Sequence, residues 1–313
     1  MSLPAFPPNL RVIVRGWLNC NQVLLMDPVR KEGEHVLIDS AYGRDAKKTL
    51  DLINGALDGN RLHRIINTHC HSDHMGGNAV LRDAFQCRIT IPAGEAEHVL
   101  PWNDQSAWCE MTDQFAERFD FDDMIKPGDV FLAGGMTWRA FAAPGHDMDA
   151  LMYFCADEGT LITGDALWEN GMGFVWPTKG PEVNPFIDAA LATLNQIDAL
   201  QPRCIIPGHG VPFSGVAGAL DRARGRLLAF AKAPEKNARH VVKVMFVFAL
   251  LDKQRMAVTD VPAYLAGVPV YRDMNEGYLF CDYNMLAERT LSELVAANAV
   301  KIEEGWVTPN MAA

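Results

Sequence analysis

Three histidines and an aspartate crowd into the stretch Thr68-His69-Cys70-His71-Ser72-Asp73-His74-Met75-Gly76-Gly77-Asn78. Imidazoles at positions i and i+2 of an extended segment point to the same side, so His69 and His71 can bind one metal ion together. Asp73 and His74 follow where the chain is expected to turn into a helix, and they can contact a second ion beside the first. Histidines that are merely solvated or buried in a core seldom show this spacing. The stretch therefore predicts a metal site.

Three further donors each follow a glycine directly, at the ends of expected strands. They are His146 in Pro144-Gly145-His146-Asp147, Asp165 after Thr163-Gly164, and His209 in Pro207-Gly208-His209-Gly210. Functional sites tend to be built where the strands of an α/β domain end. Each of these donors alone would more often be structural. Together with the first stretch, they supply nitrogen ligands for two ions and a carboxylate that can bridge them.

Around these motifs the sequence predicts an α/β fold of interleaved strands and helices. Strands are expected near residues 10–15, 22–26, 35–39, 64–67, 88–91, 130–132, 137–143, 151–155, 160–163 and 203–206, and helices near residues 44–57 and 185–200. The second of these helices has the clearest start, because Asn184 can cap it and Pro185 suits its first turn.

Beyond about residue 214 the glycines and short strands give way to longer helical patterns. Helices are expected near residues 217–233, 238–251 and 286–297, followed by a hairpin with the turn Glu303-Glu304-Gly305. We therefore expect two parts: a catalytic domain at residues 1–214, and a C-terminal helical, winged-helix-like module at residues 215–313.

The metal-ligand motifs, in this order, resemble those of the metallo-β-lactamase-fold superfamily of metallohydrolases, over about residues 10–214. The resemblance implies a four-layer αββα sandwich, in which two mixed sheets are flanked by helices and the site lies at one edge between them. It also implies the ligands of two divalent metal ions: His69, His71 and His146 for the first, Asp73, His74 and His209 for the second, and Asp165 as the bridge.

Two neighbouring dications can share a water and lower its pKa to about 7, which gives a bridging hydroxide at neutral pH. In the geometry that the resemblance implies, Asp73 lies beside this water and is expected to be the catalytic residue that orients it and accepts its proton. Histidine and aspartate ligands suit zinc, which we expect, as well as iron and manganese. These features predict a binuclear metal-dependent hydrolase that acts on a small ester, thioester or lactone.

Among the hydrolases of this superfamily, glyoxalase II-type thioesterases have the nearest familiar activity. They are similar in their ligand set, but the basic glutathione-binding residues of their C-terminal helices are not recognisable here. Secreted β-lactamases are less favoured, because many carry a cysteine where this chain has Asp165.

Two alternative functions stay open at this stage. One is a metal-dependent endoribonuclease or phosphodiesterase with a winged-helix-like module, since residues 221–243 contain seven basic side chains. Such runs usually form a solvated helix face, and nucleic acid is therefore the less favoured partner. The other is a metal-containing binding protein without turnover.

Aromatic residues follow Asp165 closely, in the glycine-containing stretch 167–177. They predict a loop over the metals, in which Trp168 and Trp176 line an apolar pocket for a small-molecule substrate. Core packing, or a contact between two copies in a homodimer, is equally compatible with these aromatic residues. Tyr42, at the end of an early strand, is a further candidate substrate contact, although a structural role is favoured there.

Composition and charge exclude several classes of protein and partner. A chain of 313 residues with 49% hydrophobic content can form a sizeable core, which excludes a mainly disordered protein. The net charge of −11 argues against nucleic acid or an anionic membrane as the main partner, although residues 1–214 carry −12 and residues 215–313 carry +1. Seven irregularly spaced cysteines and an N-terminus without a secretory pattern predict the cytoplasm, and the longest apolar run is too short to span a bilayer.

Overall fold

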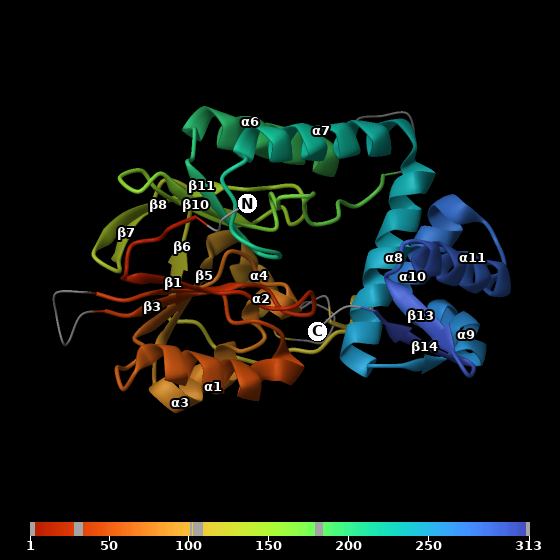
Figure 1. The fold of residues 1–313 in the computed structure, drawn as a ribbon, viewed down its shortest axis with the longest axis horizontal. Helices are drawn as coiled ribbons and strands as arrows, with labels where there is room; N and C mark the ends of the chain where they lie inside the picture. Colours follow the sequence, from red (N-terminus) through yellow and green to blue (C-terminus); the bar gives the residue numbers. More distant parts are fainter. Residues whose placement is uncertain (1–3, 28–33, 101, 103–108, 179–183, 311–313) are drawn as a thin grey trace.

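The computed structural model describes residues 4–27, 34–100, 102, 109–178 and 184–310. Two β-sheets lie face to face, with helices on the outer side of each (Figure 1). Helices α1 (Ala46–Leu57) and α3 (Asn78–Phe85) cover the first sheet, and α6 (Pro185–Leu200) and α7 (Val216–Lys232) cover the second. This is the predicted four-layer αββα sandwich.

The first sheet has the strand order β1-β2-β3-β4-β5-β6. Its strands are β1 (Leu10–Ile13), β2 (Gln22–Leu25), β3 (Val36–Ile38), β4 (Arg64–Ile66), β5 (Arg88–Pro92) and β6 (Asp123–Ile125). The first three pair antiparallel, and β3 to β6 pair parallel, so the sheet is mixed.

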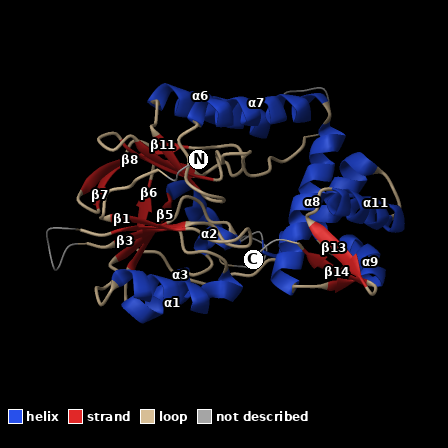
Figure 2. Ribbon diagram, viewed as in Figure 1, coloured by secondary structure: helices blue, strands red, loops and turns tan. Residues whose placement is uncertain are grey.

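The second sheet has the order β11-β10-β9-β8-β7. Its strands are β7 (Val130–Ala133), β8 (Met136–Ala142), β9 (Leu151–Cys155), β10 (Thr160–Gly164) and β11 (Cys204–Pro207). Only the β10–β11 pair is parallel; the other pairs in this sheet are antiparallel. Figure 2 shows the two groups of strands between the helical layers.

Alternation along the strands explains why the two sheets pack together. Successive side chains of a strand point to opposite faces, so each buried strand can serve two cores. On β3, Val36 and Ile38 face the core between the sheets, whereas Leu37 packs under α1 and α3. On β4, Ile66 and Ile65 divide in the same way.

The remaining helices of this part are short. They are η1 (Gly43–Asp45), α2 (Ser72–Met75), η2 (Ala93–Glu95), α4 (Ala96–Val99) and α5 (Cys109–Thr112). Helix α6 has the predicted bounds, and the Asn184 side chain caps it by accepting hydrogen bonds from the backbone N–H groups of Phe186 and Ile187. Strand β6 was not predicted, because it has three residues and only Ile125 in it is buried.

The C-terminal module has a hydrophobic core of its own, which contains Phe246, Leu250 and Tyr271. Its elements are α8 (Pro234–Lys253), β12 (Met256–Ala257), η3 (Val258–Asp260), α9 (Val261–Gly267), α10 (Pro269–Met274), the π-helical turn η4 (Asn275–Leu279), α11 (Tyr283–Ala296), β13 (Val300–Glu303) and β14 (Trp306–Pro309). The three strands form a small sheet of order β12-β14-β13, which includes the expected hairpin.

Buried side chains divide between the two parts within the loop that joins α7 to α8. Leu220 and Leu227 of α7 belong to the core under α6, and the core of the module begins with Ala238 of α8. The boundary expected near residue 214 lies before α7. Because α7 packs in the core under α6, this helix belongs to the outer layer of the sandwich.

Ion pairs and ring contacts hold α8 against the sandwich. The Arg44 guanidinium lies 2.9 Å from an Asp252 carboxylate oxygen, and the Lys253 ammonium lies 2.8 Å from an Asp113 carboxylate oxygen. The rings of Tyr42 and Phe248 meet edge to face at 5.3 Å. Helix α8 is therefore fixed over one edge of the sandwich.

Candidate metal centre

The predicted donors come together from the ends of four strands. His69 and His71 lie in the segment after β4, and the chain then turns into α2, as expected, with Asp73 and His74 inside that helix. The other three follow strands of the second sheet: His146 comes after β8, Asp165 directly after β10, and His209 after β11. Two sheets thus contribute to one site at the edge between them.

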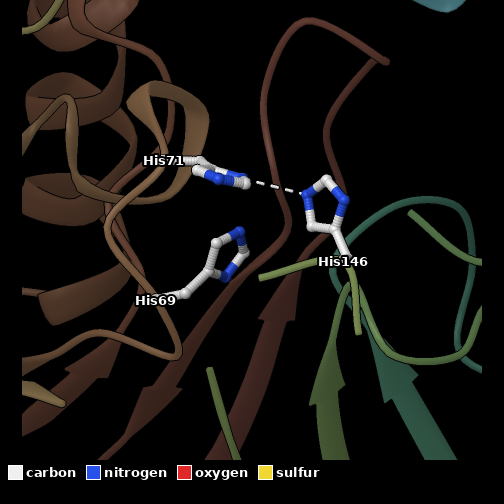
Figure 3. Close-up of side chains that lie close together, drawn as sticks. All are labelled: His69, His71 and His146. Carbon is white, nitrogen blue, oxygen red and sulfur yellow. Dashed lines mark hydrogen bonds between the residues drawn. The ribbon is translucent and has the colours of Figure 1, made fainter. Parts of the chain in front are cut away.

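Three histidines form the first donor group. One ring nitrogen from each of His69, His71 and His146 lies within 4.8 Å of the others. Nδ1 of His71 is 2.9 Å from Nε2 of His146, and Figure 3 shows the three rings converging on one point. Three imidazole nitrogens at this spacing can coordinate one cation.

Four side chains form the second group beside the first. Asp73, His74, Asp165 and His209 each offer one atom, again within 4.8 Å of one another. The Asp165 carboxylate faces both groups: its Oδ2 is 3.5 Å from Nε2 of His146, and its Oδ1 is 3.4 Å from Nε2 of His74. This carboxylate therefore lies between the two donor groups.

Two ring nitrogens without a hydrogen-bond partner indicate that these groups fit a metal. Nε2 of His69 and Nε2 of His74 are fully buried and have no hydrogen-bond partner in the structure. Buried polar atoms are nearly always paired, and an orphaned imidazole nitrogen inside a cluster of other donors calls for an ion. The donor set therefore fits two divalent cations.

At His69 and Asp165 the electrostatics agree with that fit. Burial lowers the pKa of His69 well below its ordinary value, and the neighbouring His74 and His71 lower it further. Burial raises the pKa of Asp165, but the imidazoles of His209, His74 and His146 outweigh it and hold that pKa well below its usual range. Neutral imidazole and ionised carboxylate are the forms that bind metal.

Hydrogen bonds outside the donor groups orient the rings. Nδ1 of His74 lies 2.8 Å from Oδ2 of Asp39, which leaves Nε2 directed at Asp165. Nδ1 of His146 lies 2.6 Å from the Phe174 carbonyl oxygen, which directs its Nε2 at His71. Partners of this kind select the tautomer of a ligand and hold its ring in place.

At two positions the backbone lies so close to the donors that only glycine fits. A Cβ on Gly173 would lie 2.5 Å from Cγ of His146, and a Cβ on Gly208 would lie 2.3 Å from Oδ1 of Asp165. Any larger residue at either position would displace a donor. The glycines of these two loops therefore allow backbone to pack directly on the site.

A cavity of about 390 Å³ opens above the two donor groups. His71, Asp73, His146, Asp165 and His209 line its floor. Trp168 and Trp176, the two predicted pocket residues, also line it. Tyr42 is fully buried beside Phe248 and is not among the lining residues that the described part of the chain provides.

Two sets of lining residues were not predicted from the sequence. Trp17 stacks on the His209 ring, with centroids 5.6 Å apart and planes inclined by 4°. The other set is one face of α8, which includes Val244, Val247 and Phe248. Neither set belongs to a sequence motif, and only the helical spacing of the α8 residues could have suggested a shared face.

Most basic residues of the 221–243 run are used within the molecule. Arg222 and Arg226 donate to the backbone carbonyls of Glu169 and Asn170. Arg224 pairs with Asp198, and Arg239 and Lys243 pair with Glu293. These residues tie α7 and α8 to their neighbours, and of the seven only Lys243 lines the cavity.

Comparison with known proteins matches residues 15–209 to the metallo-β-lactamase superfamily. The chain belongs to this superfamily. Among curated relatives, a hydroxyacylglutathione hydrolase of Rhodopseudomonas palustris is 32% identical over 67% of this chain and 74% of its own length. Another, from Nitrobacter winogradskyi, is 27% identical over 79% of this chain and 86% of its own length.

Solved structures of the superfamily share the fold of the whole chain. A β-lactamase domain protein from Burkholderia ambifaria has a TM-score of 0.60 and 21% identity, and the match covers 100% of this chain and 94% of that one. A metallo-β-lactamase family protein from Thermus thermophilus has a TM-score of 0.59 and 20% identity, with 97% and 100% coverage. At these identities the likeness concerns the fold alone.

Membership of the metallo-β-lactamase superfamily makes this chain a metal-dependent hydrolase, as the sequence predicted. An enzyme is thereby favoured over a binding protein without turnover. Within the described ranges, no helix is both long and apolar enough to cross a membrane. The seven cysteines, all of which are described, form no disulfide.

Proposed function

We propose that this metallo-β-lactamase-superfamily chain hydrolyses a small ester, thioester or lactone with two divalent cations, of which zinc is the expected metal. His69, His71 and His146 would hold one cation, Asp73, His74 and His209 the other, and Asp165 would contact both. The observation that carries the proposal is that residues of both donor groups line the floor of one cavity. A substrate in that cavity would place its carbonyl directly on the cations.

The cations would supply Lewis acidity at the carbonyl oxygen and would lower the pKa of a water in the site. Asp73 would orient this water, because its carboxylate lines the cavity and its Oδ2 is already fixed 3.1 Å from Nε2 of His209. The water proton passes to the Asp73 carboxylate while the water oxygen bonds to the acyl carbon. When the carbon–sulfur or carbon–oxygen bond breaks, the same proton leaves on the thiol or alcohol.

Trp168 would position Asp165 for this chemistry. Its indole Nε1 donates a hydrogen bond to Oδ1 of Asp165 at 3.2 Å. The Trp168 ring also meets the rings of His209 and Trp17 edge to face, at 5.2 and 5.3 Å. One side chain thus links the proposed bridging carboxylate to the wall of the cavity.

The endoribonuclease alternative has less support. An RNA backbone requires several basic contacts aligned along a groove. Arg222, Arg224 and Arg226 are instead engaged with residues of the same chain, and apolar and aromatic side chains surround the cavity. A small substrate fits this lining better than a phosphodiester chain does.

The direct test is a substrate panel on purified protein of measured metal content. It includes neutral thioesters, a hydroxyacylglutathione, lactones, a phosphodiester and single-stranded RNA. We expect turnover of thioesters or lactones, and none of RNA. Cleavage of RNA alone would replace the proposal with the endoribonuclease function. No turnover of any substrate by the zinc, iron or manganese form would reject hydrolysis at this site.

A further inference from the structure

The roof of the cavity comes from one face of α8. Val244, Val247, Phe248 and Leu251 all line the cavity. Their spacing of three and four residues places them along one side of the helix. Val244, Val247 and Phe248 are only partly buried, although their helix is packed on both the sandwich and the module core, so their free surface faces the cavity.

Aromatic rings form the walls between this roof and the metal floor. On one side Phe174 lies against the His146 ring at 5.0 Å, and Trp176 meets Phe174 at 5.3 Å. On the other side Trp17 and Trp168 flank His209. Apart from the polar side chains of Ser72, Thr112 and Gln114, a group that enters the cavity from the floor therefore meets apolar and aromatic walls.

Charge is nearly absent above the floor. Among the described lining residues, the charged side chains are Asp73 and Asp165 of the floor and Lys243 of the roof. The Lys243 ammonium is already engaged by a Glu293 carboxylate oxygen at 2.7 Å, and Arg239 and Arg289 share that carboxylate. Burial, together with the nearby Arg226 and Lys243, lowers the pKa of His240, the other titratable roof residue, to about 4, so this ring is neutral at pH 7.

We infer that the cavity takes a neutral hydrocarbon group of the substrate, and that α8 determines how long this group can be. The inference rests on the proposed function only in placing the reacting carbonyl on the floor. A glutathione carrier bears two carboxylates and an ammonium group, and the roof offers no unpaired partner for them among the described residues. A charged group buried without a partner is costly, so such carriers are disfavoured.

Binding tests the roof without any turnover. Butanol, hexanol and octanol are titrated into the metal-loaded protein, and quenching of the tryptophan fluorescence reports occupancy. Each buried methylene contributes about a fourfold gain in affinity, so octanol should bind more than about 50-fold tighter than butanol. Equal affinity for the three alcohols would overturn the inference. Tight octanol binding by a protein that hydrolyses no ester would reject the proposed function alone.

Hydrolysis of a matched thioester series tests chain length. We expect kcat/KM to rise from the acetyl to the octanoyl thioester of N-acetylcysteamine, and the octanoyl substrate to exceed a hydroxyacylglutathione. Val244→Trp, which fills the roof, should lower kcat/KM for the octanoyl thioester at least tenfold and change the acetyl value by less than about twofold.

The matched control is Val130→Trp, at an exposed position of β7 outside the cavity. It should leave the whole series unchanged. Metal content and thermal melting show whether each variant is folded. If Val244→Trp does not fold, the alcohol titration of the unaltered protein still tests the inference. Preference for the hydroxyacylglutathione, or a length profile that Val244→Trp does not alter, would contradict the inference.

Discussion

The floor and the roof of the cavity are built in opposite ways. The floor consists of imidazoles and carboxylates that come from strand ends and from α2, and hydrogen bonds to acceptors such as the Asp39 carboxylate hold the rings in orientation. The roof consists mainly of apolar α8 side chains such as Val244 and Phe248, which offer a substrate dispersion contacts. The floor can bind cations and perform chemistry, whereas the roof can select which substrate reaches them.

This difference means that damage to the two regions should be separable. A change in the floor should alter turnover or metal affinity and leave alcohol binding intact. A change in the roof, such as Val244→Trp, should alter chain-length preference and leave the metal content intact.

The largest expected effect is in the floor, from Asp73→Asn. An amide cannot accept the water proton, so we expect kcat to fall about 10²- to 10⁴-fold. Octanol affinity should stay unchanged, because Asp73 does not belong to the roof. Steady-state kinetics, with the metal content measured on the same sample, is the check.

The control for this change is Asp51→Asn, on the exposed face of α1. It should have the activity of the unaltered protein. An Asp73→Asn protein with intact metal content and full turnover would remove Asp73 from the proposed catalytic role.

A smaller effect is expected from Asp39→Asn. Asp39 accepts hydrogen bonds from the backbone N–H of Thr68 at 2.7 Å and from its hydroxyl at 2.8 Å, and lies 2.8 Å from Nδ1 of His74. An amide turns one acceptor oxygen into a donor that faces other donors, so His74 loses its orientation. Metal affinity at the second group should fall about 10- to 100-fold, as measured by competition with a chromogenic chelator. Unchanged affinity would show that His74 is held by its packing alone.

The contrast between floor and roof also explains how much the sequence could predict. His69, His71, Asp73 and His74 lie within six residues, and the strand-end glycines mark His146 and His209, so local patterns were sufficient for the floor. Most of the strands and the long helices were predicted for the same reason, since hydrophobic periodicity is local.

Tertiary packing determines the rest. Trp17 reaches His209 across 192 residues of sequence, and α8 is held over the site by long-range contacts that include the ion pairs of its C-terminal end with Arg44 and Asp113. Hydrophobic periodicity in the sequence does not predict contacts between residues that are so far apart along the chain. The short helices α9 and α10 were missed because each has a proline in its first turn and they span only seven and six residues.

The smallest expected effect is where the two regions meet, at Trp168. Trp168→Phe keeps an aromatic ring in the wall and removes the N–H that donates to Asp165. A hydrogen bond to a charged group is worth about 1.5–3 kcal/mol when buried, and this one is partly solvated, so we expect a loss of about tenfold or less in kcat. Octanol affinity should change by less than about twofold. A larger effect on octanol binding than on kcat would place Trp168 in the roof alone.

Metal titration tests the central claim most directly. Protein stripped by a chelator is titrated with zinc while the hydrolysis of octanoyl-N-acetylcysteamine and the binding of octanol are followed together. We predict that hydrolysis is absent without metal and reaches its plateau at two equivalents of zinc per chain, whereas octanol affinity stays nearly constant. Full hydrolysis by the stripped protein, or a plateau at one equivalent, would contradict a floor that works through two cations.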